Sequence, residues 1–187
     1  MKIAIDMDDT IFKTEQTIYP YICDYYKLPY EKIIKDNTFN YAKIKELDGY
    51  EEFTKNNWEK IVPTAELYEN AKEVINELYD SGVDITILTA RNLLEYKNPI
   101  ETTRLQLETH GIKYSRIEAN VYEKGKYCVD NNIICLIDDS VRQYLTCPDT
   151  VKVIMPNRRF NEYFKCEYKP NDWLEIKNII NEMKASN

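Results

Sequence analysis

The sequence contains one histidine and five cysteines, none of them in a CxxC pair, and it has no apolar run long enough to span a membrane. The odd number of cysteines without paired spacing predicts reduced thiols, most of them buried. The single histidine, His110, is distant in sequence from every cysteine, which argues against a cysteine nucleophile. We expect a cytoplasmic protein without a signal peptide, since the N-terminus turns acidic after its first apolar residues.

Basic residues are scattered along the chain rather than clustered, and the net charge of the 187 residues is −7. Nucleic acids and membrane surfaces attract positively charged proteins, so we expect no stable nucleic-acid complex and no membrane partner. The length and a hydrophobic content of 43% are sufficient for one domain with a modest insertion. An acidic protein of this kind needs local cations, a metal ion or backbone amides to bind an anionic substrate.

Short apolar runs alternate with helical patterns along most of the chain. The runs lack the in-and-out alternation of a half-exposed strand, which is typical of parallel strands buried on both faces. We therefore predict an α/β fold in which helices cover both faces of a parallel sheet. The strands are expected at residues 2–6, 83–88, 116–119, 133–137 and 151–155.

Residues 14–63 differ from the rest of the chain in composition and pattern, with helical spacing of the apolar residues and many tyrosines. We interpret this segment as an insertion of short helices, a cap, so that residues 1–13 and 64–187 form the core domain. Thr64 is expected to be the N-cap of a helix that ends at Gly82. Further helices are expected at 99–111, at 126–131, after Ser140 and at 171–184.

Polar side chains follow three of the predicted strands at the point where each strand ends. Asp6 and Asp8 follow the first strand, Thr89 the second, and Asp138 and Asp139 the fourth. The carboxyl ends of parallel strands lie at one edge of the sheet, so we expect these groups to converge there. Carboxylates that share a pocket raise one another's pKa values, and a divalent cation reverses this effect. Hard oxygen ligands in an incomplete protein shell indicate Mg²⁺.

A magnesium site of this kind indicates a phosphorylated substrate, because Mg²⁺ keeps waters and takes an oxygen from a phosphate group. One carboxylate of the cluster can attack phosphorus and form an aspartyl-phosphate. Another can protonate the leaving oxygen and afterwards accept a proton from the hydrolytic water. A threonine hydroxyl and a lysine ammonium would bind the phosphoryl oxygens.

In four places the chain resembles the motifs of the haloacid dehalogenase (HAD) superfamily of phosphatases, in the order that this superfamily has. They are DMDDT after KIAI, a threonine after ITIL, a lysine in EKGKYC, and two aspartates after CLI. The resemblance implies a Rossmann-like three-layer α/β/α core with a small helical cap inserted after the first strand. It also implies that Asp6 is the nucleophile and that Asp8 is the general acid and base.

The same resemblance implies phosphate binding by Thr89, by its neighbour Ala90 and by Lys124, with Lys126 as the alternative lysine. Taken alone, Thr89 would more often be the N-cap of a following helix, and only within the set of motifs is phosphate binding the favoured interpretation. Arg91 either reaches the same phosphate or lies on the surface.

For the metal, the resemblance implies a Mg²⁺ site formed by Asp6, by the backbone carbonyl of Asp8, and by Asp138 and Asp139. One of the last two would bind the ion directly and the other would support it, in an order that the sequence leaves open. Asp9 stands where the superfamily most often has glycine, and because Asp tolerates turn geometry we expect the loop to keep its shape. The presence of Asp8 favours phosphoryl transfer over dehalogenation, since a halide needs no acid to leave.

We therefore predict a Mg²⁺-dependent phosphomonoesterase that acts on a small phosphorylated substrate. The DMDDT opening, the helical insertion and the LIDD ending look like the 5′(3′)-deoxyribonucleotidase-like branch, which implies a nucleoside monophosphate. The alternatives are a sugar-phosphate or other small-metabolite phosphatase, a nucleic-acid 3′-phosphatase, and a catalytically retired domain that binds phosphorylated ligands. The sequence leaves the oligomeric state open, with a homodimer as one option.

The tyrosine-rich insertion has two interpretations. Its aromatic side chains either stack on a nucleobase or form the core that a helical lobe of roughly 50 residues needs. Packing is the favoured interpretation for any single residue. The residues concerned are Tyr19, Tyr25, Tyr26, Phe39 and Trp58.

Overall fold

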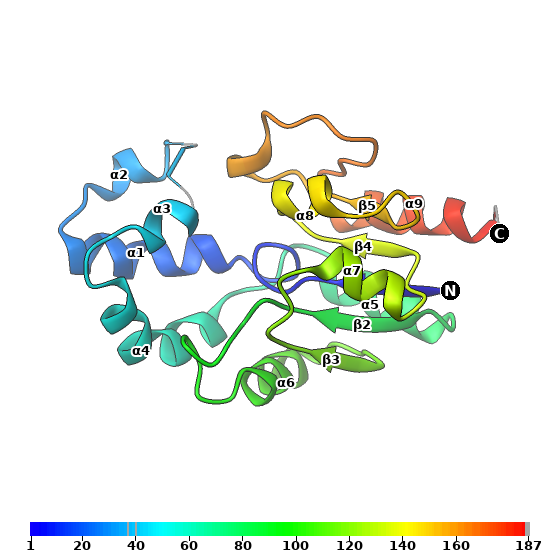
Figure 1. Ribbon diagram of the computed structural model, residues 1–187, viewed down its shortest axis with the longest axis horizontal. Coiled ribbons are helices and arrows are strands. Elements are labelled where there is room, and N and C mark those ends of the chain that lie inside the picture. The colour runs from blue at the N-terminus through cyan, green and yellow to red at the C-terminus, as the bar shows by residue number, and fades with distance from the viewer. Residues whose placement is uncertain (37, 40, 186–187) are drawn as a thin grey trace.

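The computed structural model describes residues 1–36, 38–39 and 41–185, and a five-stranded parallel sheet lies at its centre (Figure 1). The strand order is β3-β2-β1-β4-β5, with β1 in the middle. This confirms the predicted α/β fold class, and each observed strand lies within a predicted range. The strands are β1 Lys2–Ile5, β2 Asp84–Leu88, β3 Arg116–Glu118, β4 Cys135–Ile137 and β5 Lys152–Ile154.

The central strand shows why the sheet needs cover on both faces. Ile3 and Ile5 point to one face and Ala4 to the other, and all three residues are fully buried. Ile3 pairs with Ile85 of β2 on one side and with Cys135 of β4 on the other. A short run of wholly buried residues of this kind belongs in a parallel sheet between two helical layers.

Helices cover both faces of the sheet (Figure 1). The layer next to Ile3 and Ile5 contains α5, α6 and α9, where Trp173 of α9 packs in the same core as Ala71 of α5. The layer next to Ala4 contains α7 and α8. The bounds are α5 Ala71–Asp80, α6 Pro99–His110, α7 Lys124–Asp130, α8 Val141–Thr146 and α9 Trp173–Ala185.

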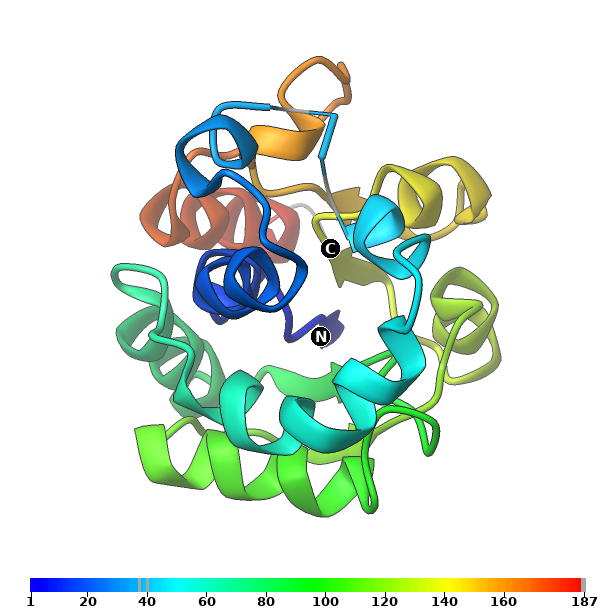
Figure 2. The same cartoon turned by 90° about the vertical axis from the view of Figure 1, so that its left-hand side faces the viewer.

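Residues 14–63, the cap, form a group of helices beyond the carboxyl ends of the strands (Figure 1, Figure 2). Apolar side chains of the cap form a cluster of their own that includes Ile18 and Trp58, and Tyr96 of the core joins it. The cap contains α1 Thr14–Tyr26, α2 Tyr30–Ile33, α3 Tyr41–Lys45 and α4 Tyr50–Ile61, and the 3₁₀ turn η1 Val62–Thr64 follows. That the cap is a domain in its own right stays a prediction.

Thr64 does not begin a helix, so that prediction is wrong. The helix begins at Ala71 instead, and residues 65–68 run alongside the loop that follows β1. The Tyr68 N–H donates to Ile11 O at 2.9 Å. Bonds to a loop distant in sequence therefore replace the helical bonds that the local pattern favours.

No helix within the described ranges is long and apolar enough to cross a membrane. All five cysteines are described, and each is a free thiol. Cys23, Cys128 and Cys135 are buried, as predicted for most of them. Burial raises the pKa of the Cys128 thiol to about 12, so this thiol belongs to the packing of the core.

Candidate active site

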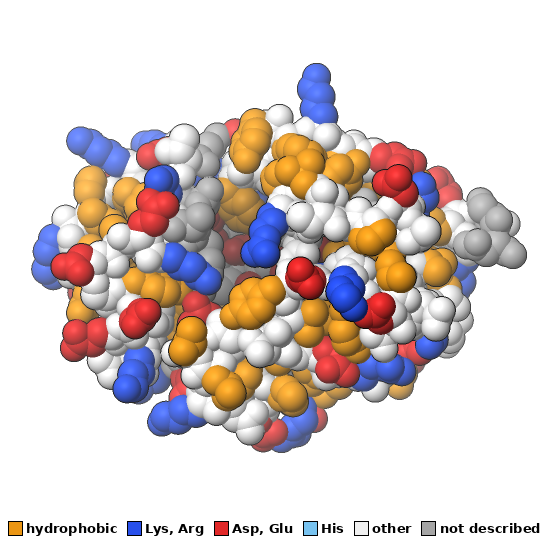
Figure 3. Space-filling view, viewed as in Figure 1, with side chains coloured by type: hydrophobic (Ala, Val, Ile, Leu, Met, Phe, Trp, Pro, Cys, Tyr) orange, Lys and Arg blue, Asp and Glu red, His pale blue; other side chains and the backbone are white. Residues whose placement is uncertain are grey.

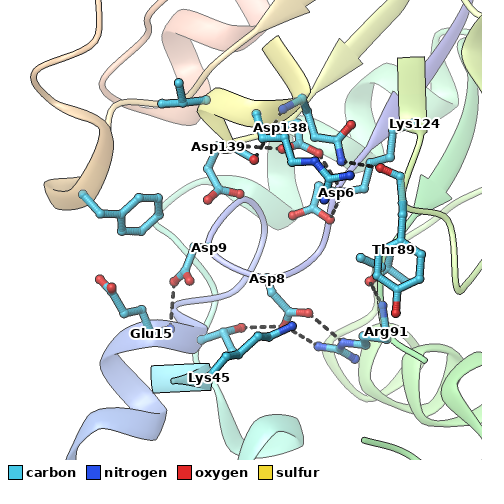
Figure 4. Close-up of a pocket in the computed structure, with 18 of the residues that line it drawn as sticks. Asp6, Asp8, Asp9, Glu15, Lys45, Thr89, Arg91, Lys124, Asp138 and Asp139 are labelled. Carbon is cyan, nitrogen blue, oxygen red and sulfur yellow. Dashed lines mark hydrogen bonds and ion pairs between the residues drawn. The ribbon is translucent and has the colours of Figure 1, made fainter. Parts of the chain in front are cut away.

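The polar residues that follow the strands converge at one edge of the sheet, between the sheet and the cap (Figure 4). Asp6 follows β1, Thr89 follows β2 and Asp138 follows β4. Lys124 reaches the same point from the first residue of α7. The Asp6 N–H donates to Ile137 O at 2.9 Å, which continues the pairing of β1 and β4 up to the site and holds the Asp6 backbone in place.

Lys124 lies between two carboxylates. Its Nζ donates to Asp6 Oδ1 at 2.5 Å and to Asp138 Oδ2 at 2.6 Å, and all three side chains are buried. Burial alone would lower the pKa of Lys124, but these two carboxylates raise it above its ordinary value, so the ammonium stays charged. Lys126 is exposed and pairs with Asp130 on its own helix. The structure therefore places Lys124, and not Lys126, in the site.

The carboxylates of Asp6, Asp138 and Asp139 form a compact acidic group. One oxygen from each lies within 4.8 Å of the other two. Asp139 also accepts a hydrogen bond from the Thr10 hydroxyl at 3.0 Å, and Asp138 accepts one from the Ser140 N–H at 2.9 Å. Burial raises the pKa of Asp6 to about 7 and that of Asp139 well above its ordinary value, and neighbouring carboxylates add to both shifts.

The acidic group fits a divalent cation that prefers oxygen ligands. It offers three hard donors, and the raised pKa values show that the Lys124 ammonium alone does not offset their burial and mutual repulsion. The Asp8 carboxylate is not part of this group. A role for Asp8 in metal binding therefore depends on its backbone carbonyl, and the ligand set as a whole stays a prediction.

The Asp8 carboxylate lies next to Arg91 and the cap (Figure 4). It accepts bonds from Arg91 Nε at 2.9 Å, from Arg91 Nη2 at 2.7 Å and from the Thr14 hydroxyl at 2.7 Å. Burial alone would raise the pKa of Asp8, but Arg91 and Thr14 hold it below its ordinary value. Arg91 is only 3% exposed, so the surface position that the sequence left open for it is wrong.

The loop after β1 makes a tight turn at Asp9. The φ of Asp9 is 58°, in the left-handed region that glycine adopts most easily and that Asp tolerates. The Asp9 N–H donates to Phe12 O at 2.8 Å, and the Ile11 N–H donates to Met7 O at 2.9 Å. The Asp9 carboxylate accepts a bond from the Glu15 N–H at 2.8 Å, at the start of α1. The turn therefore keeps its shape with Asp in place of glycine.

Thr89 and Ala90 line the same cavity as Lys124. The Thr89 hydroxyl is buried and accepts a bond from the Arg91 N–H at 3.2 Å. Thr89 is not a helix N-cap, since the next helix, α6, begins at Pro99. In the part of the chain that the structure describes, the Ala90 N–H has no acceptor, so it is free to donate to an anion. The phosphate-binding role of both residues stays a prediction.

A cavity of about 480 Å³ lies between the acidic group and the cap. Figure 3 shows it as a hollow with acidic side chains inside and basic side chains at its rim. Lys45 of the cap lines it and pairs with Glu95 at 3.5 Å. Arg142 of α8 also lines the cavity, is exposed, and forms no ion pair with any residue within the described ranges. This wall therefore offers one cation without a carboxylate partner.

The aromatic side chains that are exposed at the cavity come from the core. Tyr122 is 43% exposed and Tyr163 is 72% exposed, and both line the cavity. Trp58 of the cap also lines it, but only 1% of this residue is exposed and it packs against Tyr50 and Phe53. The packing interpretation therefore holds for Trp58.

Comparison with protein-family models found no match, and comparison with curated proteins found none either. Solved structures share the fold over nearly their whole length. A HAD-superfamily hydrolase from Ehrlichia chaffeensis has a TM-score of 0.60 at 15% identity, over 98% of this chain and 97% of that one. A "predicted phosphatase" from Clostridium acetobutylicum has a TM-score of 0.68 at 14% identity, over 97% and 98%.

A phosphoserine phosphohydrolase-like protein from Francisella tularensis has a TM-score of 0.60 at 16% identity, over 96% of this chain and 100% of that one. At these identities the likeness establishes a shared fold. The chain therefore has the Rossmann-like α/β fold of HAD-superfamily hydrolases, with a five-stranded parallel sheet between two layers of helices.

The sequence pattern predicted no role for three further residues near the site. The Thr10 hydroxyl bonds to Asp139, and the Asn161 amide donates to the backbone O of Asp139 at 2.8 Å. Arg158 donates from Nε to Asp9 O at 2.6 Å. Thr10 directly follows the acidic run and could have been noticed for that reason. Arg158 and Asn161 lie in PNRRFNEY, where no spacing marks them.

Proposed function

We propose that this chain is a member of the HAD superfamily and a phosphomonoesterase that hydrolyses a small phosphorylated molecule with the help of Mg²⁺. The main support is that the Lys124 ammonium lies within hydrogen-bonding distance of both the Asp6 and the Asp138 carboxylates, at the ends of the strands. The fold that holds them is shared with solved HAD-superfamily hydrolases.

In the proposed reaction, a carboxylate oxygen of Asp6 attacks phosphorus, and the bond from phosphorus to the leaving oxygen breaks. Asp8 gives a proton to the leaving oxygen, and then removes a proton from the water that attacks the aspartyl-phosphate. This second step releases inorganic phosphate and restores the Asp6 carboxylate. The contact of Asp8 with Arg91 keeps its carboxylate beside the cavity in both steps.

Four groups would stabilise the negative charge of the phosphoryl group in this proposal. Lys124 and the Ala90 N–H donate to its oxygens, together with the Thr89 hydroxyl. Asp6, Asp138 and Asp139 would hold Mg²⁺, which would supply the positive charge that lets the acidic site accept an anion. Lys124 also fixes the Asp6 side chain through its 2.5 Å contact.

A nucleoside monophosphate is the first candidate substrate. The cavity of about 480 Å³ has the size of a small-molecule site, and the cap closes one side of it. The exposed rings of Tyr122 and Tyr163 are surfaces on which a base can stack. The layout of the sequence, with the cap directly after the first motif, favours the same substrate.

Arg142 favours a second candidate, a small metabolite that carries another anionic group besides its phosphate. Arg142 lines the cavity, is exposed, and forms no ion pair with a described residue. A carboxylate or a second phosphate would pair with it. One of the similar structures is described as a phosphoserine phosphohydrolase-like protein, whose name refers to a phosphorylated carboxylic acid.

Hydrolysis of p-nitrophenyl phosphate with and without Mg²⁺ tests the proposed function. We expect turnover that requires the metal and that is lost in Asp6→Asn. Asp130→Asn, which changes an exposed aspartate of α7, is the matched control and keeps the activity. Equal, background-level rates for the wild type and Asp6→Asn would mean that the domain is catalytically retired. A panel of nucleotides, sugar phosphates and phosphorylated acids, compared by kcat/KM, then distinguishes the candidate substrates.

A further inference from the structure

The turn after β5, residues 156–161, is tied to the acidic group by a buried asparagine. Asn161 is fully buried, and its Nδ2 donates to Asp139 O at 2.8 Å and to Pro156 O at 3.0 Å. Its Oδ1 accepts a bond from the Arg158 N–H at 2.9 Å. The backbone of this turn therefore cannot shift without breaking buried hydrogen bonds next to Asp139.

Arg158 points from this turn to the loop after β1. Its Nε donates to Asp9 O at 2.6 Å and its Nη2 to Thr10 O at 3.3 Å, while its guanidinium lies 3.7 Å from the centre of the Tyr68 ring. Arg158 is only 9% exposed, and it pairs with no carboxylate among the residues that the structure describes. A buried charge that bonds to backbone carbonyls fixes the position of those carbonyls.

Arg159, the next residue, points the opposite way, into the cap. The residue before it has extended backbone, with φ −132° and ψ 157°, and successive side chains on extended backbone alternate in direction. Arg159 Nη2 lies 2.9 Å from Glu15 Oε1, 2.7 Å from Tyr19 OH and 2.7 Å from Phe39 O. Its Nη1 donates to Asp36 O. One side chain thus holds α1 and the segment that precedes α3.

These contacts form a closed ring of four residues. Asp9 accepts from Arg158 through its carbonyl and from the Glu15 N–H through its carboxylate. The Glu15 carboxylate in turn pairs with Arg159. Arg158 and Arg159 are neighbours in the turn whose backbone the buried Asn161 holds in place. The position of α1 and the position of the Asp9 backbone therefore depend on each other.

We propose that Arg158 and Arg159 are positioning residues that couple the cap to the loop after β1. A movement of the cap that takes Glu15 away from Arg159 opens the ring, and the carbonyls of Asp9 and Thr10 lose part of their support. The loop then has the geometry seen here only while α1 is in place. The coupling rests on the proposed function in one respect only: the loop matters for catalysis because it follows directly on Asp6, the proposed nucleophile.

Hydrogen–deuterium exchange of the full chain tests the coupling without metal or substrate. The amides of Asp9, Ile11 and Phe12 are hydrogen-bonded within the loop, so their exchange reports its opening. We expect Arg159→Ala to speed this exchange about fivefold or more, which is the lower end of the range for coupling between distant sites. The effect would appear in the loop even though the side-chain contacts of Arg159 are with the cap. Arg104→Ala removes an arginine of α6 with two carboxylate partners, and as the matched control it leaves the exchange unchanged.

If Arg159→Ala speeds exchange only in the cap and leaves the exchange of the loop unchanged, the proposed coupling is overturned. Kinetics supply a second readout that a merely structural role would not move. We expect Arg159→Ala and Arg158→Lys to lower kcat by up to about a hundredfold through misplaced groups, with a smaller change in KM. A rise in KM with kcat unchanged contradicts the positioning role.

The two proposals fail in different ways. A wild-type protein that hydrolyses no phosphate ester would overturn the proposed function, and the exchange experiment would still decide the coupling. If the enzyme is active but Arg159→Ala does not change the hydrogen exchange of the loop, the coupling is overturned and the proposed function stands. Arg159→Lys keeps the charge but has fewer donors, so we expect exchange between that of the wild type and that of Arg159→Ala.

Discussion

The Nζ of Lys124 lies 2.5 Å from the Oδ1 of Asp6, although 118 positions separate the two residues in the sequence. Asp6 ends the central strand and Lys124 begins α7, so the parallel sheet and the helix behind it bring them together. An ammonium this close to the proposed nucleophile is also close to any phosphoryl group that the nucleophile attacks. Several consequences of this arrangement can be measured.

Replacing Lys124 with alanine removes the charge that Asp6 and Asp138 share. We expect kcat/KM for p-nitrophenyl phosphate to fall by about 10²- to 10³-fold, as for the loss of one group that stabilises transition-state charge. Lys126→Ala, on the same helix but exposed, is the control and keeps the wild-type value. Equal losses in the two variants would show that Lys124 has no special role.

Replacing Arg91 with methionine removes both contacts of its guanidinium with Asp8. Arg91 holds the pKa of Asp8 below its ordinary value, so the pKa of Asp8 rises in the variant. A general acid must carry a proton, and the alkaline limb of the kcat/KM profile should therefore move to higher pH. Arg91→Lys keeps a charge without the two-point contact, and we expect a smaller shift. A limb that stays in place or moves to lower pH contradicts this role of Asp8.

Stability of the metal-free protein should fall as the pH rises. The pKa of Asp6 is about 7 in the folded chain against 3.8 as the ordinary value, so between these values the folded state binds a proton that the unfolded state has released. This contribution to stability is present at low pH and is lost as the pH rises through about 7. We expect the melting temperature to be lower at about pH 8.5 than at about pH 5.5, and the raised pKa values of Asp9 and Asp139 act in the same direction.

Two further measurements check the origin of this pH dependence. Asp6→Asn cannot titrate at this position and should make the slope shallower, while Asp9 and Asp139 still contribute to it. Mg²⁺ competes with the proton for the same carboxylates, so it should raise the melting temperature more at the higher pH. If Mg²⁺ raises the melting temperature equally at both pH values, the ion does not bind at the acidic group.

The two candidate substrates would depend on different side chains of the cavity wall, Tyr122 for the first and Arg142 for the second. For a nucleoside monophosphate, Tyr122→Ala should raise KM roughly fivefold to a hundredfold, the range for loss of one stacking contact. For a substrate with a second anionic group, Arg142→Ala should raise KM and Tyr122→Ala should not. Turnover of p-nitrophenyl phosphate at saturation should be unchanged in both variants. No effect of either variant on any substrate would place recognition elsewhere in the cavity.

Local patterns were sufficient to predict the fold and the main acidic residues. Short, wholly apolar runs mark buried parallel strands, and every observed strand lies within a predicted range. Asp6 and Asp138 could be found because each directly follows such a run, and the order of strands in a parallel sheet then brings them together. Lys124 was favoured from the sequence with Lys126 as the alternative in the same short segment, and the contacts of Lys124 with Asp6 and Asp138 decide between the two.

Contacts between distant segments were outside the reach of local patterns. Residues 65–68 have a helical pattern, yet backbone bonds to the loop after β1 hold them extended. The sequence left Arg91 either at the phosphate or on the surface, and only the folded chain shows that it is the partner of Asp8. Arg158 and Arg159 differ in which part of the protein they hold, and this depends on the backbone direction of one turn.

The most direct test is to trap the phosphorylated enzyme. Acid quenching of the wild-type protein during turnover, followed by peptide mass spectrometry, should find one phosphoryl group on the peptide that carries Asp6, and fragmentation should locate it on that residue. Continued turnover with the phosphoryl group on another side chain, or with no phosphorylated peptide under any quenching time, would contradict the account.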